Sequence, residues 1–108
     1  MGFWYVPAGY VSDVELPGLL PSVFSLDQNH PNPFNPATTI GFAVPEQSQV
    51  TIELFDLRGY RVKILVEQVF EPGLHVVNID GKELASGVYF CRMIAGDFVE
   101  TRKMMLVK

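Results

Sequence analysis

Apolar and polar residues alternate in short stretches along most of this chain. Residues 40–44 carry apolar side chains at every second position, and residues 50–55 do the same with a more polar opposite face. Successive side chains of a strand point to opposite faces, so each stretch predicts a β-strand with one face on a core. The same pattern predicts further strands at residues 23–26, 61–66, 74–79, 88–94 and 98–107.

Turn signals separate these stretches roughly every 8–12 residues, a spacing typical of all-β domains. Asp56-Leu57-Arg58-Gly59 predicts a hairpin, and Glu71-Pro72-Gly73 ends the strand that follows it. No long segment shows the helical period, and residues 82–86 are long enough for only one helical turn. The spacing predicts an all-β antiparallel sandwich of about seven strands with Greek-key connections, with an antiparallel barrel as the alternative.

Residues 29–36, which we call the collar, interrupt the alternation. Its three prolines fix the backbone φ near about −65° and remove three backbone donors, so the collar is neither a helix nor a central strand. We expect a stiff, extended junction between two modules, in which asparagines favour turn-type hydrogen bonds and Phe34 anchors the segment against the sandwich. The predicted anchoring residues are Pro31, Asn32, Pro33, Phe34, Asn35 and Pro36.

Composition indicates one domain without a membrane-spanning helix. With 108 residues, 48% of them hydrophobic, the chain can build one core, and no apolar run approaches the roughly 18 residues of a membrane helix. Residues 23–108 are predicted to form the domain. Residues 1–22 are expected to be a linker or the tail of a preceding passenger domain, with an edge strand at residues 3–6 as the alternative. The first basic residue is Arg58, so the amino terminus lacks the basic region of a secretory signal, and export by the general route would require a signal upstream of this sequence.

Charge is distributed unevenly along the chain. The net charge is −4, and the first 57 residues contain six acids and no base, whereas residues 58–108 contain six acids and eight bases. An acidic total argues against nucleic acid as a partner, because binding to phosphates requires an excess of positive charge. The locally basic residues 101–108 are either a solvated strand face or a surface for an acidic receptor.

Candidate catalytic and metal-binding residues are few. Cys91 is the only cysteine, which excludes an internal disulfide, and its strand context predicts a small buried side chain. His30 and His75 are not at metal-ligand spacing, and His75 is expected to be a half-buried strand residue. Three aspartates precede turns, where they are expected to accept backbone N–H groups: Asp56, Asp80 and Asp97. We predict no catalytic site, no cofactor and no metal.

Individual residues leave two hypotheses about a binding partner open. Arginine and tyrosine in the turn at residues 58–60 are types enriched in interaction hot spots, although such pairs also cover strand ends. An accessory carbohydrate-binding module of a secreted hydrolase is the second reading, because aromatic rings on a sandwich can stack on sugars. The only tryptophan, Trp4, lies in the expected linker, and the other candidates need not share a face: Phe55, Tyr60 and Tyr89.

A series of motifs in fixed order resembles a known family. The opening motif is Phe24-x-Leu26-x-Gln28-Asn29-x-Pro31-Asn32-Pro33-Phe34-Asn35-Pro36-x-Thr38-Thr39-Ile40. It is followed in order by Val50-Thr51-Ile52, Phe55-Asp56-Leu57-x-Gly59, Pro72-Gly73-x-His75, Asp80-Gly81, Leu84-Ala85-Ser86-Gly87-Val88-Tyr89-Phe90, Gly96-Asp97-Phe98 and Thr101-Arg102-Lys103-Met104. Over residues 22–108 the chain resembles the carboxyl-terminal sorting domains of the bacterial type IX, or Por, secretion system.

The resemblance implies an immunoglobulin-like β-sandwich at the carboxyl end of a larger exported passenger. It implies transit through the periplasm, recognition by the outer-membrane machinery, and a final location outside the cell or on its surface. In this family a sortase-like enzyme often removes the domain and attaches the passenger to surface lipopolysaccharide. The domain is the substrate of that machinery and not a catalyst.

The resemblance also suggests where the machinery would read the chain. A terminal signal is expected near the chain end, in the residues Gly87, Lys103, Met104, Met105, Leu106, Val107 and Lys108. The structural alternative is that Gly87 serves only a permissive backbone turn and that Lys103 only protects an edge strand.

Overall fold

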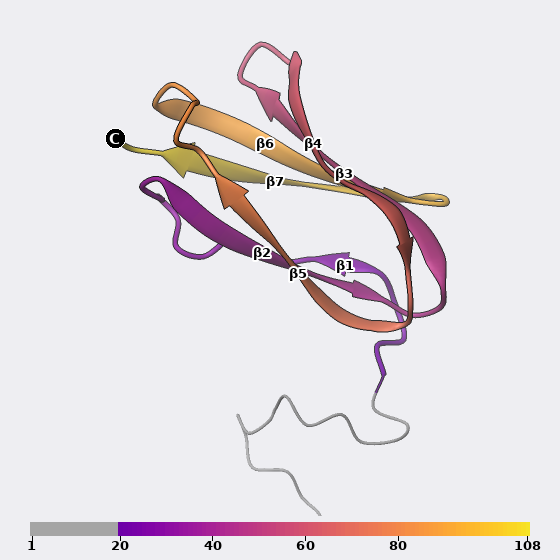
Figure 1. The fold of residues 1–108 in the computed structure, drawn as a ribbon. Coiled ribbons are helices and arrows are strands. Elements are labelled where there is room, and N and C mark those ends of the chain that lie inside the picture. The colour runs from indigo at the N-terminus through magenta and orange to yellow at the C-terminus, as the bar shows by residue number, and fades with distance from the viewer. Residues whose placement is uncertain (1–19) are drawn as a thin grey trace, which may run out of the picture.

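The computed structural model describes residues 20–108, which form seven β-strands (Figure 1). Each predicted strand overlaps one of them, although the first is shorter than predicted and the fourth continues to Phe70. In chain order the strands are β1 Ser25–Leu26, β2 Ala37–Val44, β3 Ser48–Asp56, β4 Arg61–Phe70, β5 Gly73–Asp80, β6 Gly87–Ala95 and β7 Phe98–Leu106. Residues 1–19 lie outside the described part of the chain, and they include the alternative edge strand at residues 3–6. Only the last three residues of the predicted linker, 20–22, are described.

The strands form two antiparallel sheets that pack face to face as the two layers of Figure 1. One sheet has the order β1-β2-β5 and the other β4-β3-β6-β7. The predicted immunoglobulin-like sandwich is therefore confirmed, and the barrel alternative is wrong because the strands divide between two separate sheets. Residues 82–86 form no helix, and a single hydrogen bond from Leu84 N to Gly81 O at 2.9 Å closes one turn.

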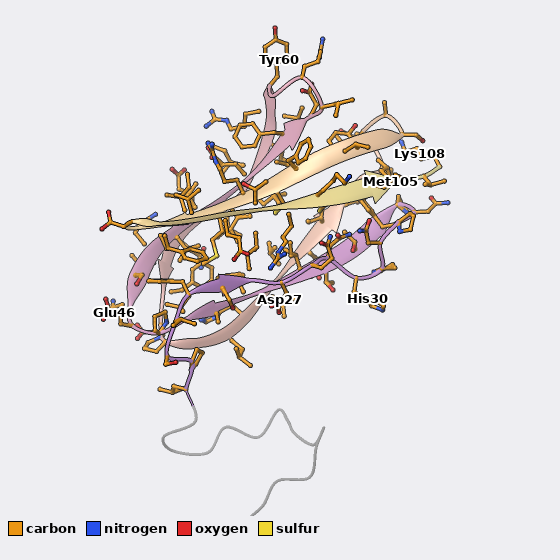
Figure 2. All side chains as sticks on the ribbon, turned by 180° about the vertical axis from the view of Figure 1, so that it is seen from behind. Asp27, His30, Glu46, Tyr60, Met105 and Lys108 are labelled. Carbon is orange, nitrogen blue, oxygen red and sulfur yellow. The ribbon has the colours of Figure 1, made fainter. Side chains whose placement is uncertain are left out.

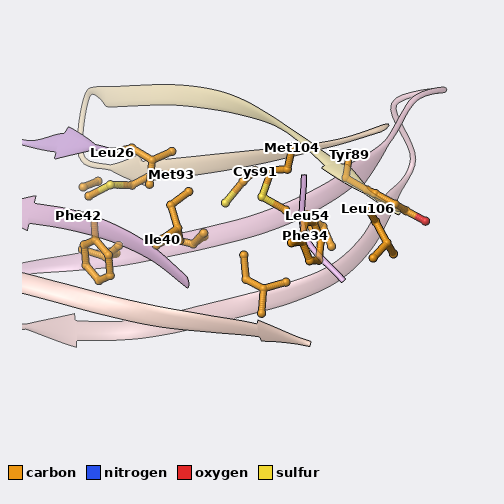
Figure 3. Close-up of a cluster of buried hydrophobic side chains, with 14 of the residues drawn as sticks. Leu26, Phe34, Ile40, Phe42, Leu54, Tyr89, Cys91, Met93, Met104 and Leu106 are labelled. Atoms are coloured by element: carbon orange, nitrogen blue, oxygen red, sulfur yellow. The ribbon is translucent and has the colours of Figure 1, made fainter. Parts of the chain in front are cut away.

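Strand alternation builds the core between the sheets. On β3 the residues Val50, Ile52 and Leu54 are fully buried, and on β6 Cys91 and Met93 are equally inaccessible. All five belong to one cluster with residues of the opposite sheet, and Figure 3 shows Leu54, Cys91 and Met93 together with Ile40 and Phe42. A fully buried side chain of this size contributes about 1.5–3 kcal/mol of transfer free energy, so the alternation in the sequence accounts for most of the folding drive.

Tyr89 closes the loop before β6. Its side chain is 7% exposed, and its hydroxyl donates to the backbone oxygen of Ala85 at 2.6 Å. A tyrosine near the start of this strand that bonds back to the preceding loop is a recurrent feature of immunoglobulin-like sandwiches. Tyr89 is therefore part of the fold and not of an aromatic surface.

Candidate functional site: the collar and strand β7

The structure places the collar directly against β7, although the two are more than 70 residues apart in the sequence. Phe34 N donates to Met105 O at 2.9 Å, and Val107 N donates to Phe34 O at 2.9 Å, which gives a short parallel pairing. Met105 N donates to Asn32 Oδ1 at 3.0 Å. Gln28, which precedes the collar, donates through Nε2 to Lys103 O at 2.7 Å. Among residues 20–108, no strand pairs with this edge of β7, and the collar occupies it.

The collar is held in shape by its own hydrogen bonds. Asn29 is 3% exposed, and its Nδ2 donates to Pro31 O at 3.0 Å and to Thr38 Oγ1 at 3.1 Å. Thr38 Oγ1 in turn donates to Pro31 O at 2.8 Å. The sequence predicted an extended segment, but the chain bends at residues 31–33 and again at 35–36, and the peptide bonds before all three collar prolines are cis. The bends leave Phe34 as the single point at which the collar enters the core.

Phe34 is 1% exposed and belongs to the same cluster as Leu54 and Leu106 (Figure 3). Gly81 completes this region from the turn after β5, where its N donates to Pro36 O at 2.7 Å. A Cβ at Gly81 would lie 3.0 Å from Leu106 Cδ2, 3.2 Å from Phe34 Cε2 and 3.2 Å from Pro36 O. The collar and β7 approach the backbone so closely here that any larger side chain would displace one of them.

The predicted recognition residues divide between the two faces of β7. Met104 and Leu106 are at most 1% exposed and belong to the core. Met105 is 43% exposed and Val107 46%, and Lys103 is also exposed. Recognition of the folded domain through β7 must therefore use the outward side chains and not the inward pair.

A cleft of about 160 Å³ lies where the collar meets β7, lined by Asn32, Pro33, Lys103, Met104 and Met105. Lys108 lies beyond β7, where its N donates to Ser86 Oγ at 3.1 Å and its Nζ to Lys82 O at 2.7 Å. Figure 2 shows His30, Met105 and Lys108 at one end of the molecule, with Glu46 at the other. One end of the sandwich therefore combines the collar with the exposed part of β7.

Gly87, the remaining predicted recognition residue, is the first residue of β6 and pairs with Leu106. Its φ of 152° lies where side-chain-bearing residues are rare, and a Cβ there would meet nothing within 4 Å. The backbone conformation alone accounts for glycine at this position.

Sequence reasoning missed a charged cluster on the outer face of the four-stranded sheet. Glu53 is 7% exposed although it points away from the core, because Arg61 Nη1 donates to Oε2 and Arg92 Nη2 to Oε1, both at 3.0 Å. Burial raises the pKa of Glu53, but the bonds from Arg92 and Arg61 outweigh it and hold the pKa below its ordinary value. Arg92 is 39 residues from Glu53, so only the strand register reveals the cluster.

Several other predicted residues have structural environments. Cys91 is fully buried, and burial raises the pKa of its thiol to about 12. His75 is half-buried, with its ring 5.4 Å from that of Phe42 and 4.8 Å from that of Phe70. Its Nε2 lies 2.7 Å from Glu71 O.

The turn at residues 58–60 is organised by Asp56. Its Oδ1 accepts from Arg58 N at 2.9 Å and from Tyr60 N at 3.0 Å, as expected for an aspartate before a turn. Burial slightly opposes ionisation of Asp56, but these bonds and Arg58 lower its pKa. Tyr60 is 63% exposed at the tip of the hairpin, and the Arg58 guanidinium lies 4.8 Å from the centre of its ring (Figure 2).

Within residues 20–108, histidine, cysteine, aspartate and glutamate side chains do not gather in a group of three that could hold a metal ion. The same part of the chain has no helix of the length and hydropathy needed to cross a membrane.

Comparison with models of protein families matches residues 29–108 to the secretion system C-terminal sorting domain. The matched region begins at the first residue of the collar and extends past β7. Searches of curated proteins and of solved structures found no match to this chain.

Proposed function

Because the chain belongs to the family of secretion system C-terminal sorting domains, we propose that it is a non-catalytic signal read by the outer-membrane machinery of type IX secretion through the collar and β7. A sorting signal of this family implies a larger passenger protein and export toward the cell surface or the extracellular space. Residues 1–22 connect the passenger to the domain in this proposal. The passenger crosses the periplasm, and a sortase-like enzyme then processes it.

The main structural support for the proposal is the hydrogen-bonded contact between the collar and β7. The collar bonds occupy the open backbone edge of β7, and Met104 and Leu106 are in the core. Among the predicted recognition residues 103–107, the side chains of Lys103, Met105 and Val107 point outward and are accessible to a partner. The rigid pairing holds these side chains beside Asn32 and Pro33, so collar and strand present one surface.

The experiment is a fusion of the 108-residue chain to a periplasmic reporter in a host with type IX secretion. We expect the reporter outside the cell or on its surface, and we expect it in the periplasm of the same host without the outer-membrane translocon. Retention of the reporter in both hosts would contradict the proposal. The substitution Met105→Asp, which changes an exposed side chain, should reduce export while the purified chain remains folded.

The residues on which carbohydrate binding would depend do not form a platform together. Tyr89 points into the core, and the Arg92 guanidinium lies 4.5 Å from the centre of the Phe55 ring. Tyr60 stands at the hairpin tip, and Trp4 lies outside the described residues. We therefore do not propose a carbohydrate-binding function.

A further inference from the structure

A row of four side chains crosses the outer face of the four-stranded sheet, with one residue from each strand. Arg61 on β4 pairs with Phe55 on β3, Phe55 pairs with Phe90 on β6, and Phe90 pairs with Lys103 on β7. Paired residues of antiparallel strands point to the same face, so the two phenylalanine rings lie between two cations. We call these four residues the outer row. Both rings are half-buried and both cations are exposed.

Positive charge exceeds negative charge at the outer row. The Glu53 carboxylate accepts from both Arg61 and Arg92, so one acid faces two arginines, and Lys103 adds a third cation. Three cations minus one carboxylate leave a local charge of +2, in a chain whose total is −4. Arg92 Nε is inaccessible to water and has no hydrogen-bond partner among the described residues. The surface is thus matched to a partner with carboxylates.

A hollow of about 260 Å³ lies next to the outer row, beneath the hairpin between β3 and β4. Its walls include Phe55, Leu57, Phe90, Arg92 and Thr101. Leu57 is 70% exposed although it is apolar. These three apolar side chains suit an aliphatic or aromatic side chain of the partner. The Asp56 carboxylate also lines the hollow, and its charge is paired with Arg58.

We propose that the outer row and its hollow bind an acidic, partly apolar polypeptide segment of the secretion machinery. This inference rests on the proposed function, because it extends the surface at which the same machinery reads the domain. Lys103 belongs both to the outer row and to the cleft beside the collar, so the two surfaces are continuous. The partner therefore contacts β7 at its end with apolar groups and crosses the sheet with its carboxylates toward Arg92 and Arg61.

The outer face of the other sheet offers a matched control. Leu74 and Val76 are 70% and 68% exposed there, so this face is also apolar. Its neighbours across the strands include Asp27, whose carboxylate lies close to Gly41, and β5 ends at Asp80, so the face is acidic and not basic. An acidic partner that needs both charge and apolar contact should distinguish the two faces.

The test compares the double variant Phe90→Ser, Lys103→Glu with the control Val76→Ser, Lys82→Glu, which makes comparable changes on β5 and in the exposed turn that follows it. Each full chain competes with labelled wild type for detergent-solubilised outer membranes of the secretion-competent host. We expect the outer-row variant to compete at least about tenfold more weakly and the control to stay within about twofold. Binding of the wild type should weaken as NaCl rises from about 50 to about 500 mM.

A photo-crosslinker at Thr101 tests the chemistry of the partner. We expect it to label a peptide of the machinery that is rich in aspartate and glutamate, while the same crosslinker at Asn78 on the opposite face does not. A labelled peptide with a net positive charge would overturn the inference. If the double variant unfolds, Phe90→Leu with Lys103→Gln replaces it, because both side chains keep most of their volume.

The failures of the two proposals are distinguishable. If the wild-type fusion is exported and the outer-row variant competes and is exported equally well, the outer row is not a binding surface and the proposed function stands. If the wild-type fusion is retained, the proposed function itself is wrong. Self-association of the chain in sedimentation experiments, abolished by the outer-row variant, would assign the surface to a second copy and overturn the inference.

Discussion

The two edges of the four-stranded sheet are protected in different ways. On β7 the collar supplies hydrogen bonds from Phe34 and Asn32, and further along Arg102 Nε donates to Leu26 O at 2.7 Å. Among residues 20–108, β4 pairs with β3 alone. Its protection is its charge, from Arg61, Lys63 and Glu67, and two register shifts in its pairing with β3.

The difference explains the sequences of the two strands. The run Met104-Met105-Leu106-Val107 is continuously apolar, and an open strand of this kind readily pairs with other chains. The collar removes that hazard, so β7 can place apolar side chains both in the core and on the surface. β4 lacks a covering segment among the described residues and interrupts its apolar residues with charges. Both strands expose apolar side chains, so the difference lies in the backbone edge, which the collar covers on β7 and which charged side chains protect on β4.

The largest expected effect comes from detaching the collar. Phe34→Ala should lower the free energy of unfolding by about 3–5 kcal/mol, because it deletes a fully buried ring and leaves a cavity. Urea denaturation measures the loss, and light scattering should show aggregation through the uncovered β7. Leu57→Ala, at a side chain 70% exposed, should change stability by no more than about 0.5 kcal/mol. Equal effects of the two substitutions would contradict the anchoring role of Phe34.

The next largest effect tests the close approach behind the collar. Gly81→Ala should cost about 1–3 kcal/mol, because its Cβ would press on Pro36 O, a backbone atom that cannot rotate away. Thermal unfolding checks this, with Glu83→Ala in the same exposed turn as the control. A variant as stable as the wild type would show that the collar can retreat from the turn, and that its position is looser than the hydrogen bonds indicate.

The charged cluster tests the β4 side of the comparison. Glu53→Gln should cost about 1–3 kcal/mol at pH 7, since two hydrogen bonds from arginines lose their ionised acceptor. The folded pKa of Glu53 lies below its ordinary value of 4.5, so its contribution is fully present above about pH 4.5 and is lost as the pH falls through the folded pKa. Urea midpoints at several pH values measure this dependence. Glu53→Gln should flatten it, whereas Glu46→Gln at an exposed carboxylate should not.

The smallest expected effect concerns one hydrogen bond of the covered edge. Asn32→Ala removes the acceptor of Met105 N and should cost about 0.5–1.5 kcal/mol. Amide hydrogen exchange should accelerate at Met105 more than at neighbouring β7 residues. Asn35→Ala, in an exposed asparagine of the same collar, should leave exchange at Met105 unchanged. If both variants protect Met105 as the wild type does, the side chain of Asn32 does not guard this edge.

The sequence predicted the strands well because each one follows from a local pattern. Residues 40–44 and 50–55 show their inward faces through alternation alone, and the structure buries those positions. The turn aspartate Asp56 is equally local, since its partners lie two and four residues away. Such features need no knowledge of which strands become neighbours.

The arrangement of the candidate site could not be predicted in the same way. The collar and β7 were each singled out, but their contact depends on a pairing across 73 residues, between Asn32 and Met105. The collar was expected to be extended because proline fixes only φ, and its bends depend on the bonds of Asn29 and Thr38. Gly81 was interpreted as a turn residue, whereas its neighbours in space require the glycine. Each failure concerns a contact between segments that are distant in the sequence.

Because the collar bonds to residues at the end of β7, the two sheets can close on the collar only after β7 has been synthesised. Phe34 of the collar is synthesised more than 70 residues before its backbone partners Met105 and Val107. A chain interrupted before β7 lacks Met104 and Leu106 in the core and leaves Phe34 without its backbone partners. The pairing of the collar with β7 joins residues that are more than 70 positions apart, so we expect it to form late in folding. A closed sandwich therefore shows that translation has passed residue 107.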